Sequence, residues 1–308
     1  MKNTYNSGIF FLFIYCLFSC FAQVAMGHYE LSISQYLLAS YVFVITVLFY
    51  SVAICKQRKE TFQKFKKDIF LVTKINFSTA VAWLALIYAL KYIEPAIALS
   101  IGFAALTIST MLISHFHKET TKPTAIDFLL SMMLFTLITI LCVHLIHKNE
   151  TSHALTSKKL LLGISFCLIS GISSAFNTIH AECLSRRDFT SIQILAIRFY
   201  LTLFIAFIIL YTMHQRMIPN AHEAWPIVLL SFTSTIIPMY FAQKGITLTN
   251  AIAVALVTPI LPAMTFFMEL LDPRIKFSSF VFTISLLISI TILFGAVHKI
   301  QKHAKMVA

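Results

Sequence analysis

Four residues on one face of a long apolar segment could bind a small polar ligand or move a proton. Thr258, Pro262, Thr265 and Glu269 follow one another at steps of four, three and four residues, which places them on one side of a helix. A second proline, Pro259, precedes Pro262 by three residues. Proline frees a backbone carbonyl one turn earlier, and in apolar surroundings that carbonyl needs a hydroxyl, another protein group or water. We expect Thr258 to help satisfy it.

Glu269 ends this apolar segment, so its carboxylate lies at the edge of the helix. That position favours a gate or an anchor that pairs with Arg274 just beyond. The alternative is a proton site or a site for the amine of a ligand, because ionisable groups in such segments are functional by default. We therefore assign Pro259 and Pro262 as a hinge and Glu269 as a gate.

Two cations lie inside apolar segments. Lys74 is about five residues into the segment 69–90, from where its side chain can snorkel to the polar end. Arg198 is about seven residues into 191–213, where snorkelling is harder. Its guanidinium either clamps backbone carbonyls or a facing acid, or contacts the carboxylate or phosphate of a ligand directly.

A polar stripe on the segment 159–181 is the next candidate. Ser173, Asn177 and His180 are spaced by four and three residues, and such stripes face protein or water rather than lipid. His180 is either a neutral hydrogen-bonding group between helices or a protonation switch that makes function depend on pH.

Further candidates share helix faces with small or aromatic residues. Asn76 and Trp83 lie on one face of 69–90 and could offer a ligand a polar end and a stacking surface. Ser100 and Thr107 are seven residues apart, a spacing that also fits tight helix packing. The predicted ligand-binding residues are Asn76, Trp83, Tyr88, Ser100, Thr107, Asn177, His180, Arg198, Tyr240, Gln243 and Thr258.

The elements that must position these residues are strongly apolar. Of the 308 residues, 58% are hydrophobic and 12% are charged, and the mean hydropathy is +0.84. A soluble protein of this size could not bury so much apolar surface, which indicates a polytopic membrane protein. The net charge of +12 does not indicate nucleic-acid binding, because the basic residues lie in short gaps between apolar runs. The six cysteines show no metal-like spacing.

Ten apolar runs are long enough to cross a bilayer, which takes about 20 residues. They are 8–26, 35–54, 69–90, 95–114, 124–146, 159–181, 191–213, 225–244, 250–269 and 277–297. The longest polar connections, 55–68 and 147–158, leave no room for a soluble domain. We predict an all-α polytopic membrane protein with ten transmembrane helices, present as a monomer or homodimer.

The distribution of Lys and Arg predicts the orientation. With the N-terminus inside, 15 basic residues lie on the cytoplasmic side and 7 on the opposite side. This bias predicts that both termini are cytoplasmic and that the protein is a multi-pass protein of the cell (inner) membrane.

The chain reads as five helices written twice. "SQYLLASYVF" (34–43) aligns with "IQILAIRFYL" (192–201), and "ALKYIEPAIALSIGFAALT" (89–107) with "AQKGITLTNAIAVALVTPILP" (242–262) after a two-residue insertion. Because five is odd, the copies would have opposite orientations, a plan typical of secondary transporters with a site near the midplane. We predict two inverted five-helix repeats, residues 1–148 and 149–308.

With this plan, the Ala-x-Lys-x-Ile at the end of the third helix, the Arg198-Phe199 pair and the run from Pro259 to Glu269, the chain resembles the EamA type of the drug/metabolite transporter superfamily. The resemblance covers nearly the whole chain. It implies a 5+5 inverted repeat, a central cavity lined mainly by helices three, four, eight and nine, and transport of small metabolites.

The first repeat departs from the pattern at three points. Ser40 aligns with Arg198, Ala104 and Thr107 align with the two prolines of the ninth helix, and Ser114 aligns with Glu269. The two halves have therefore diverged, and we expect their contacts with a substrate to be asymmetric.

These features predict a secondary active or exchange transporter of a small polar or zwitterionic, amino-acid-like metabolite, working by alternating access. The alternatives are an exchanger of a nucleoside-type cofactor such as S-adenosylmethionine and, in another class, a non-transporting membrane scaffold. No Walker motif, nucleophile elbow, HExxH or CxxC occurs in the sequence, so we expect no enzyme, no cofactor and no metal. The expected partners are the small-molecule substrate and membrane lipid, without nucleic acid.

Overall fold

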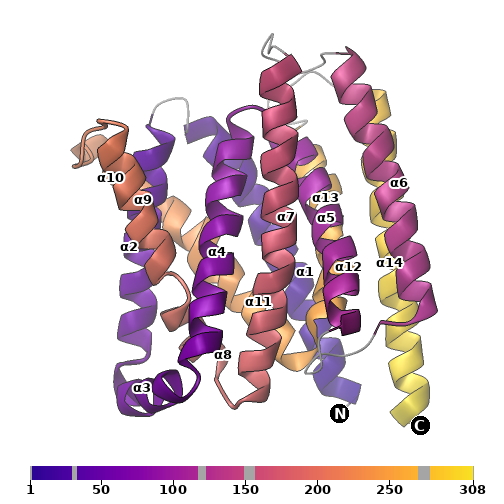
Figure 1. The fold of residues 1–308 in the computed structure, drawn as a ribbon, viewed down its shortest axis with the longest axis horizontal. Helices are drawn as coiled ribbons and strands as arrows, with labels where there is room; N and C mark the ends of the chain where they lie inside the picture. Colours follow the sequence, from indigo (N-terminus) through magenta and orange to yellow (C-terminus); the bar gives the residue numbers. More distant parts are fainter. Residues whose placement is uncertain (1, 30–32, 117–122, 149–156, 270–277, 308) are drawn as a thin grey trace.

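The computed structural model describes residues 2–29, 33–116, 123–148, 157–269 and 278–307. Within these ranges the regular elements are helices, and no strand occurs among them. Figure 1 shows long helices standing side by side, which confirms the all-α prediction.

Residues of the first half form six helices and a short 3-10 turn. They are α1 (Lys2–Tyr29), α2 (Gln35–Ala53), the turn Cys55–Gln57, α3 (Arg58–Lys67), α4 (Ile69–Leu90), α5 (Pro95–Phe116) and α6 (Ala125–Lys148).

The helices of the second half are more often interrupted. They are α7 (Ser157–Arg186), α8 (Ser191–Ile197), α9 (Tyr200–Thr212), α10 (Ala221–Leu230), the π-helical turn Ser231–Ile236, α11 (Ile237–Leu248), α12 (Ala251–Val257), the 3-10 turn Thr258–Ile260, α13 (Leu261–Glu269) and α14 (Ser279–Val307).

Eight helical segments among the described residues are long and apolar enough to cross a membrane, which identifies a multi-pass membrane protein. Three of the eight, 191–212, 221–248 and 251–268, are built from consecutive shorter helices. Each of the eight overlaps a span predicted from the sequence. The remaining two predicted spans fall on α6 and α14, whose described apolar stretches are shorter, Ala125–Leu141 and Ser279–Thr291. The count of ten transmembrane helices therefore stays a prediction.

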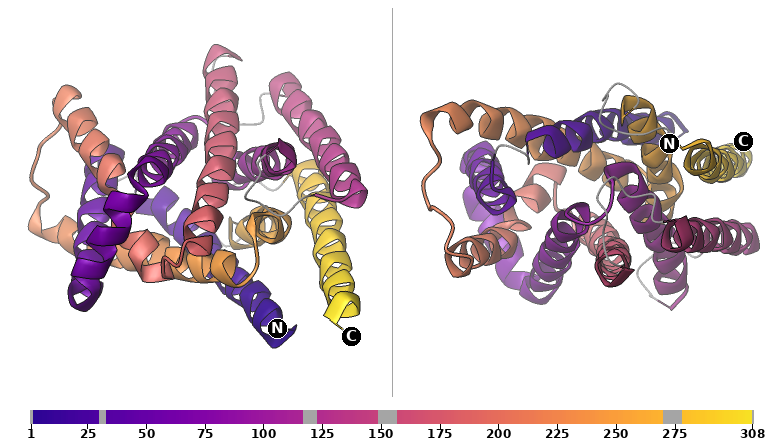
Figure 2. Two further views of the ribbon diagram at one scale, coloured as in Figure 1. Left: turned by 60° about the horizontal axis from the view of Figure 1, so that its bottom comes forward. Right: turned by 90° about the horizontal axis from the view of Figure 1, so that it is seen from above.

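The two ends of the described chain lie at the same end of the bundle, together with α3 (Figure 1). Seen from above, the yellow α14 and the neighbouring α6 stand at one edge, with α9 and α10 at the opposite edge (Figure 2). The helices between them, α1, α4, α5, α7, α11 and α12, form the middle of the bundle.

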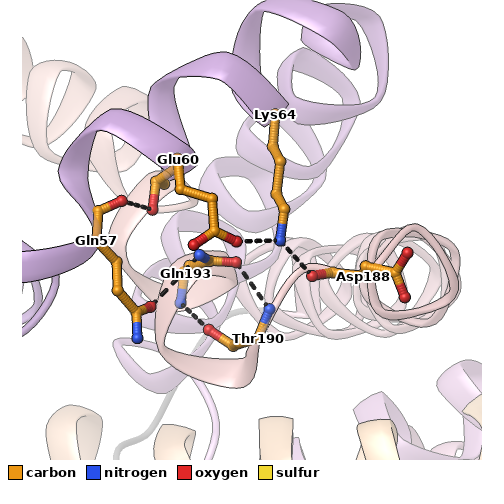
Figure 3. Close-up of polar contacts among 7 residues, drawn as sticks. Gln57, Glu60, Lys64, Asp188, Thr190 and Gln193 are labelled. Atoms are coloured by element: carbon orange, nitrogen blue, oxygen red, sulfur yellow. Dashed lines mark hydrogen bonds and ion pairs between the residues drawn. The ribbon is translucent and has the colours of Figure 1, made fainter.

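The polar connection 55–68 contains the helix α3. Hydrogen bonds link it to the turn between α7 and α8 (Figure 3). Lys64 Nζ contacts Glu60 Oε1 at 2.7 Å and donates to the Asp188 carbonyl at 2.7 Å, while Gln193 Nε2 donates to Gln57 Oε1 at 3.4 Å. The hydrogen bond from Lys64, with its charge, lowers the pKa of the Glu60 carboxyl. This network joins the two halves of the chain.

Two further contacts strengthen this junction. Arg187, the residue after α7, forms an ion pair with Asp68, the residue before α4. Thr190 and Gln193 form a capping box at the start of α8, in which each side chain accepts a hydrogen bond from the backbone N–H of the other.

A close helix crossing joins α5 to α7. A Cβ built on Gly171 would lie 2.2 Å from the Gly102 carbonyl oxygen and 2.7 Å from Ala105 Cβ, whereas a Cβ on Gly102 would meet Cys167 O at an ordinary 3.7 Å. Gly171 is the residue of the two that cannot carry a side chain without a shift of the backbone.

Gly171→Ala should therefore destabilise the protein, because overpacking of this kind costs about 1–3 kcal/mol. Gly102→Ala is the matched control, since the same methyl group enters ordinary contact distance and Ala favours the helix by up to about 1 kcal/mol. Thermal unfolding of the two purified variants in detergent measures the difference. Equal losses of stability for both variants would contradict the geometry of this crossing.

Candidate functional site

A cavity of about 130 Å³ lies in the middle of the bundle. Residues of α1, α4, α5, α7, α11 and α12 line it, together with the interruptions near Arg198, Ser234 and Thr258. Of the predicted ligand-binding residues, it brings together Trp83, Asn177, Arg198 and Thr258.

Arg198 stands at a break in a helix that the sequence predicted to be continuous. α8 ends at Ile197 and α9 begins at Tyr200. The Asn76 amide of α4 fills the gap, because its Nδ2 donates to the Ile197 carbonyl at 2.7 Å and its Oδ1 accepts from the Leu201 N–H at 3.3 Å. Asn76 is absent from the cavity lining, so the structure gives it a contact with the backbone that presents Arg198.

The Arg198 guanidinium is held by amides rather than by an acid. Nη2 donates to Asn177 Oδ1 at 2.8 Å and Nη1 donates to Gln243 Oε1 at 3.2 Å, while Thr79 Oγ1 donates to the same Asn177 oxygen at 3.2 Å. The carbon of the guanidinium lies 5.3 Å from the centre of the Phe199 ring. Arg198 is only 4% exposed, so its charge is almost fully removed from solvent.

Among the described residues, no carboxylate forms an ion pair with Arg198. Two donors at this end of the cavity, Arg198 Nε and Gln243 Nε2, lack a hydrogen-bond partner in the described part of the chain. A buried cation with unused donors is suited to bind an anionic group.

The ninth predicted span changes geometry at its prolines. The 3-10 turn Thr258–Ile260 contains Pro259 and separates α12 from α13. The carbonyl freed by Pro259 belongs to Ala255, four residues earlier. Thr107 of α5 donates to it at 2.7 Å, whereas Thr258 donates to the Val254 carbonyl at 2.9 Å. The expectation that Thr258 satisfies the freed carbonyl is therefore wrong; the hydroxyl comes from the other half of the chain.

The remaining predicted hinge and gate residues lie in α13. The carbonyl freed by Pro262 is that of Thr258, and the Leu261 N–H bonds to it. Glu269 is the last residue of α13. Its predicted partner Arg274 lies outside the described residues, so the gate remains a prediction.

A third interruption borders the cavity between α10 and α11. The π-helical turn Ser231–Ile236 brings Ser234 into the lining, and Tyr50 of α2 donates to the Ile236 carbonyl at 2.6 Å. π-helical turns are rare and often accompany functional sites.

The other predicted ligand-binding residues have different surroundings. Ser100 donates to the Ala96 carbonyl at 2.8 Å. The Tyr88 ring stacks on Phe166 with 5.5 Å between the ring centres and lies tilted against Tyr36 at 6.0 Å. None of the following belongs to the cavity lining: Asn76, Tyr88, Ser100, Thr107, His180, Tyr240 and Gln243. Gln243 reaches the cavity end only through Arg198.

Several lining residues were missed by the sequence analysis. On α7 the cavity face is Ser170, Ser174 and Asn177, spaced by four and three residues, whereas the predicted stripe ran from Ser173 through Asn177 to His180. Ser170 and Ser174 lie on the helix face next to the predicted stripe, and these small polar residues were the available signal. Tyr15 and Ser19 of α1 also line the cavity, and their four-residue spacing was a comparable signal.

Comparison with known proteins supports the resemblance drawn from the motifs. Residues 161–295 match the EamA-like transporter family. Among chains of known structure, a crystal structure of a protein with 13% sequence identity superposes over 94% of this chain and 96% of its own, with a TM-score of 0.69. At that identity the likeness concerns the fold alone. No curated protein sequence matches the chain.

The contact between Thr107 and the Ala255 carbonyl can be tested by a double-mutant cycle. Thr107→Val removes the hydroxyl, and an unsatisfied buried carbonyl costs about 1–3 kcal/mol. Pro259→Ala restores an N–H that can serve this carbonyl within its own helix. We therefore expect the cost of Thr107→Val, measured by equilibrium unfolding in mixed detergent, to be clearly smaller in the Pro259→Ala background. An undiminished cost would show that Thr107 acts through another contact.

Proposed function

We propose that this EamA-type protein of the drug/metabolite transporter superfamily carries a small polar metabolite with a carboxylate, amino-acid-like in size, across the membrane. The observation that carries the proposal is the Arg198 guanidinium, buried at the wall of the central cavity with no acidic partner among the described residues. The family match at residues 161–295 and the bundle of apolar helices support a membrane transporter.

The charge of Arg198 favours an anionic group on the substrate. A charged side chain at the centre of a membrane-spanning helix costs at least about 2.5 kcal/mol on insertion scales, and the neutral amides of Asn177 and Gln243 offset only part of this. A carboxylate would complete the site, because the planar guanidinium offers several donors in one fork and Nε is still unused.

The volume of the cavity favours a compact substrate. Its 130 Å³ is close to the roughly 150 Å³ of an engineered cavity that holds benzene, and well below the roughly 300–1,000 Å³ typical of pockets for larger ligands. This comparison supports an amino-acid-like substrate over a nucleoside-type cofactor such as S-adenosylmethionine. The cofactor remains the alternative, because Trp83 in the lining could stack on an adenine ring.

The pairing of helices supports two inverted repeats. In the first repeat α4 would correspond to the α10–α11 segment, and α7 of the second would correspond to α1. The contacts follow this exchange, since α4 packs on α7 as α11 packs on α1, and α5 packs on α6 as α12 and α13 pack on α14. Repeats 1–148 and 149–308 related in this way are the usual basis of alternating access.

The end of the bundle near α3 is the more firmly closed end. A cluster of buried apolar residues from α1, α4, α7, α8, α11 and α12 fills it, and the contacts around Lys64 and Arg187 tie the two halves together there. Around Trp83 and Phe103, on the other side of the cavity, the side chains are only partly buried. We infer that this conformation opens away from α3, and that bending at Pro259 and Pro262 contributes to the opposite state.

The α3 end is the cytoplasmic side in this proposal. The excess of Lys and Arg predicted there, 15 against 7, follows the positive-inside rule, and both ends of the described chain lie at that end (Figure 1). The protein would then be a multi-pass protein of the inner membrane with both termini in the cytoplasm.

Uptake into proteoliposomes tests the role of Arg198. A panel of amino acids, organic acids, nucleosides and S-adenosylmethionine is screened first, with and without internal substrate and a pH gradient. For a transported carboxylate, Arg198→Gln should reduce uptake by about 100-fold or more, since removing a partner of a buried charge pair costs about 3–5 kcal/mol. Arg198→Lys should recover part of it, because the charge remains without the fork.

Arg58→Gln, on the exposed face of α3, is the matched control and should leave uptake unchanged. Full uptake by Arg198→Gln would refute the substrate role of this guanidinium. Failure of every compound in the panel would favour a non-transporting scaffold.

Trp83→Ala separates the two substrate classes. A small aliphatic amino acid should be transported with a mild loss, because it makes little use of a stacking surface. An adenine-bearing substrate should lose about 5- to 150-fold, since stacking of a base on an aromatic ring contributes about 1–3 kcal/mol. Initial uptake rates at several concentrations measure the effect, and a severe loss for a small amino acid would speak against the compact-substrate proposal.

A further inference from the structure

A second pocket, of about 250 Å³, lies between α4 and α7 at the α3 end of the bundle. It shares no lining residue with the central cavity. Its lining consists of Lys67 at the end of α3, Asp68 before α4, Phe70, Leu71 and Lys74 in the first turns of α4, His180 and Cys183 near the end of α7, and Arg187 just after α7.

The charges around this pocket are unbalanced. Asp68 is the one carboxylate among its described lining residues, and it is already paired with Arg187. Lys67 and Lys74 are both exposed, and no hydrogen bond or ion pair of either ammonium group occurs among the described residues. The pocket therefore presents two uncompensated positive charges.

Lys74 is in an unusual place for a lysine. It lies inside the membrane-spanning part of α4, between the exposed Phe70 and Phe77, which are 72% and 63% exposed. Its ammonium group lies 4.2 Å from the centre of the Phe70 ring. A cation on an apolar, lipid-facing surface is unfavourable unless it reaches an anionic group at the interface, and the neighbouring pocket is where such a group would fit.

The surface that continues from the pocket is apolar. α4 and α7 pack along each other (Figure 1), and their outer faces expose Phe77 on α4, and Ile172 and Phe176 on α7. His180 lies at the boundary, where its ring stacks on Phe176 at 6.1 Å and its Nδ1 lies 3.4 Å from Ser78 Oγ. A ligand with one anionic end and long apolar chains matches both the basic pocket and the apolar surface beside it, whereas a free inorganic anion would use only the basic pocket.

We propose that this pocket binds the phosphate headgroup of an anionic phospholipid in the leaflet on the α3 side. Lys67 and Lys74 contact the phosphate, Arg187 is held beside it by Asp68, and the acyl chains lie along Phe77, Ile172 and Phe176. Basic pockets between transmembrane helices are suited to such headgroups. The site is independent of the substrate of the central cavity.

Native mass spectrometry of the purified full-length protein tests the proposal. The protein is mixed with phosphatidylglycerol or phosphatidylcholine of matched chains, and the bound lipid is counted at increasing lipid concentration. We expect the wild type to bind phosphatidylglycerol preferentially, Lys74→Gln to weaken this binding about 5-fold, and the double variant with Lys67→Gln about 30-fold.

Lys91→Gln is the matched control. Lys91 is exposed at the other end of α4, where its ammonium lies 5.9 Å from the Tyr92 ring, and its loss should leave lipid binding unchanged. Phosphatidylcholine binding serves as the internal reference for a folded protein in every variant.

Three outcomes would overturn the proposal. One is equal retention of phosphatidylglycerol and phosphatidylcholine by the wild type, and another is the same loss in Lys91→Gln as in the double variant. The third is full displacement of the lipid by millimolar inorganic phosphate, which would identify a soluble-anion site. Retention of phosphatidylglycerol that resists phosphate and depends on Lys67 and Lys74 would support the lipid site.

Discussion

A buried guanidinium that meets no acidic partner in the described part of the chain is the constraint on which the rest of this structure depends. Arg198 is almost completely shielded from solvent. Among the described residues, its guanidinium donates hydrogen bonds only to the side-chain oxygens of Asn177 and Gln243. Burying a charge is costly unless it is paired. The arrangement suits a protein whose ligand supplies the missing anion, because hydrogen-bond donors of Arg198 then remain for that ligand. The broken helix serves the same end, since the backbone at Arg198 is released from regular helix and held by Asn76.

The two halves of the chain contribute differently to the backbone around the cavity. Three spans of the second half depart from regular α-helix, after α8, before α11 and before α13. At each departure, a side chain from a regular helix of the first half forms a hydrogen bond with the backbone at or next to the interruption. These side chains are Asn76 of α4, Tyr50 of α2 and Thr107 of α5. Irregular backbone at membrane depth is tolerated only where such partners or cavity water meet it. Side chains of the first half thus support the irregular backbone of the second half around the cavity.

The all-helical fold and most of the apolar spans followed from the sequence, because the length of apolar runs is a strong signal in a membrane protein. The alignment of the two halves placed Thr107 opposite Pro262, but it gave no sign of the hydrogen bond from Thr107 to the Ala255 carbonyl. The interruptions in the helices were harder to predict from the sequence. Nothing in "IQILAIRFYL" marks an interruption, since the helix opens at Arg198 only because Asn76, more than a hundred residues earlier, bonds to both sides of the gap. The predicted polar stripe on α7 did not coincide with the face that lines the cavity, because small serines are a weaker sequence signal than His180.

The central claim is that Arg198 and its unused donors bind an anionic group on the substrate. The most direct measurement compares ligand-induced thermal stabilisation of the wild-type protein by pairs of compounds that differ only in a carboxylate or its amide, since only a bound ligand shifts the folding equilibrium. The account predicts that, for the transported compound, the carboxylate raises the unfolding temperature and its neutral amide at the same concentration does not. Equal stabilisation by the amide would contradict it, because the guanidinium would then contribute nothing to recognition.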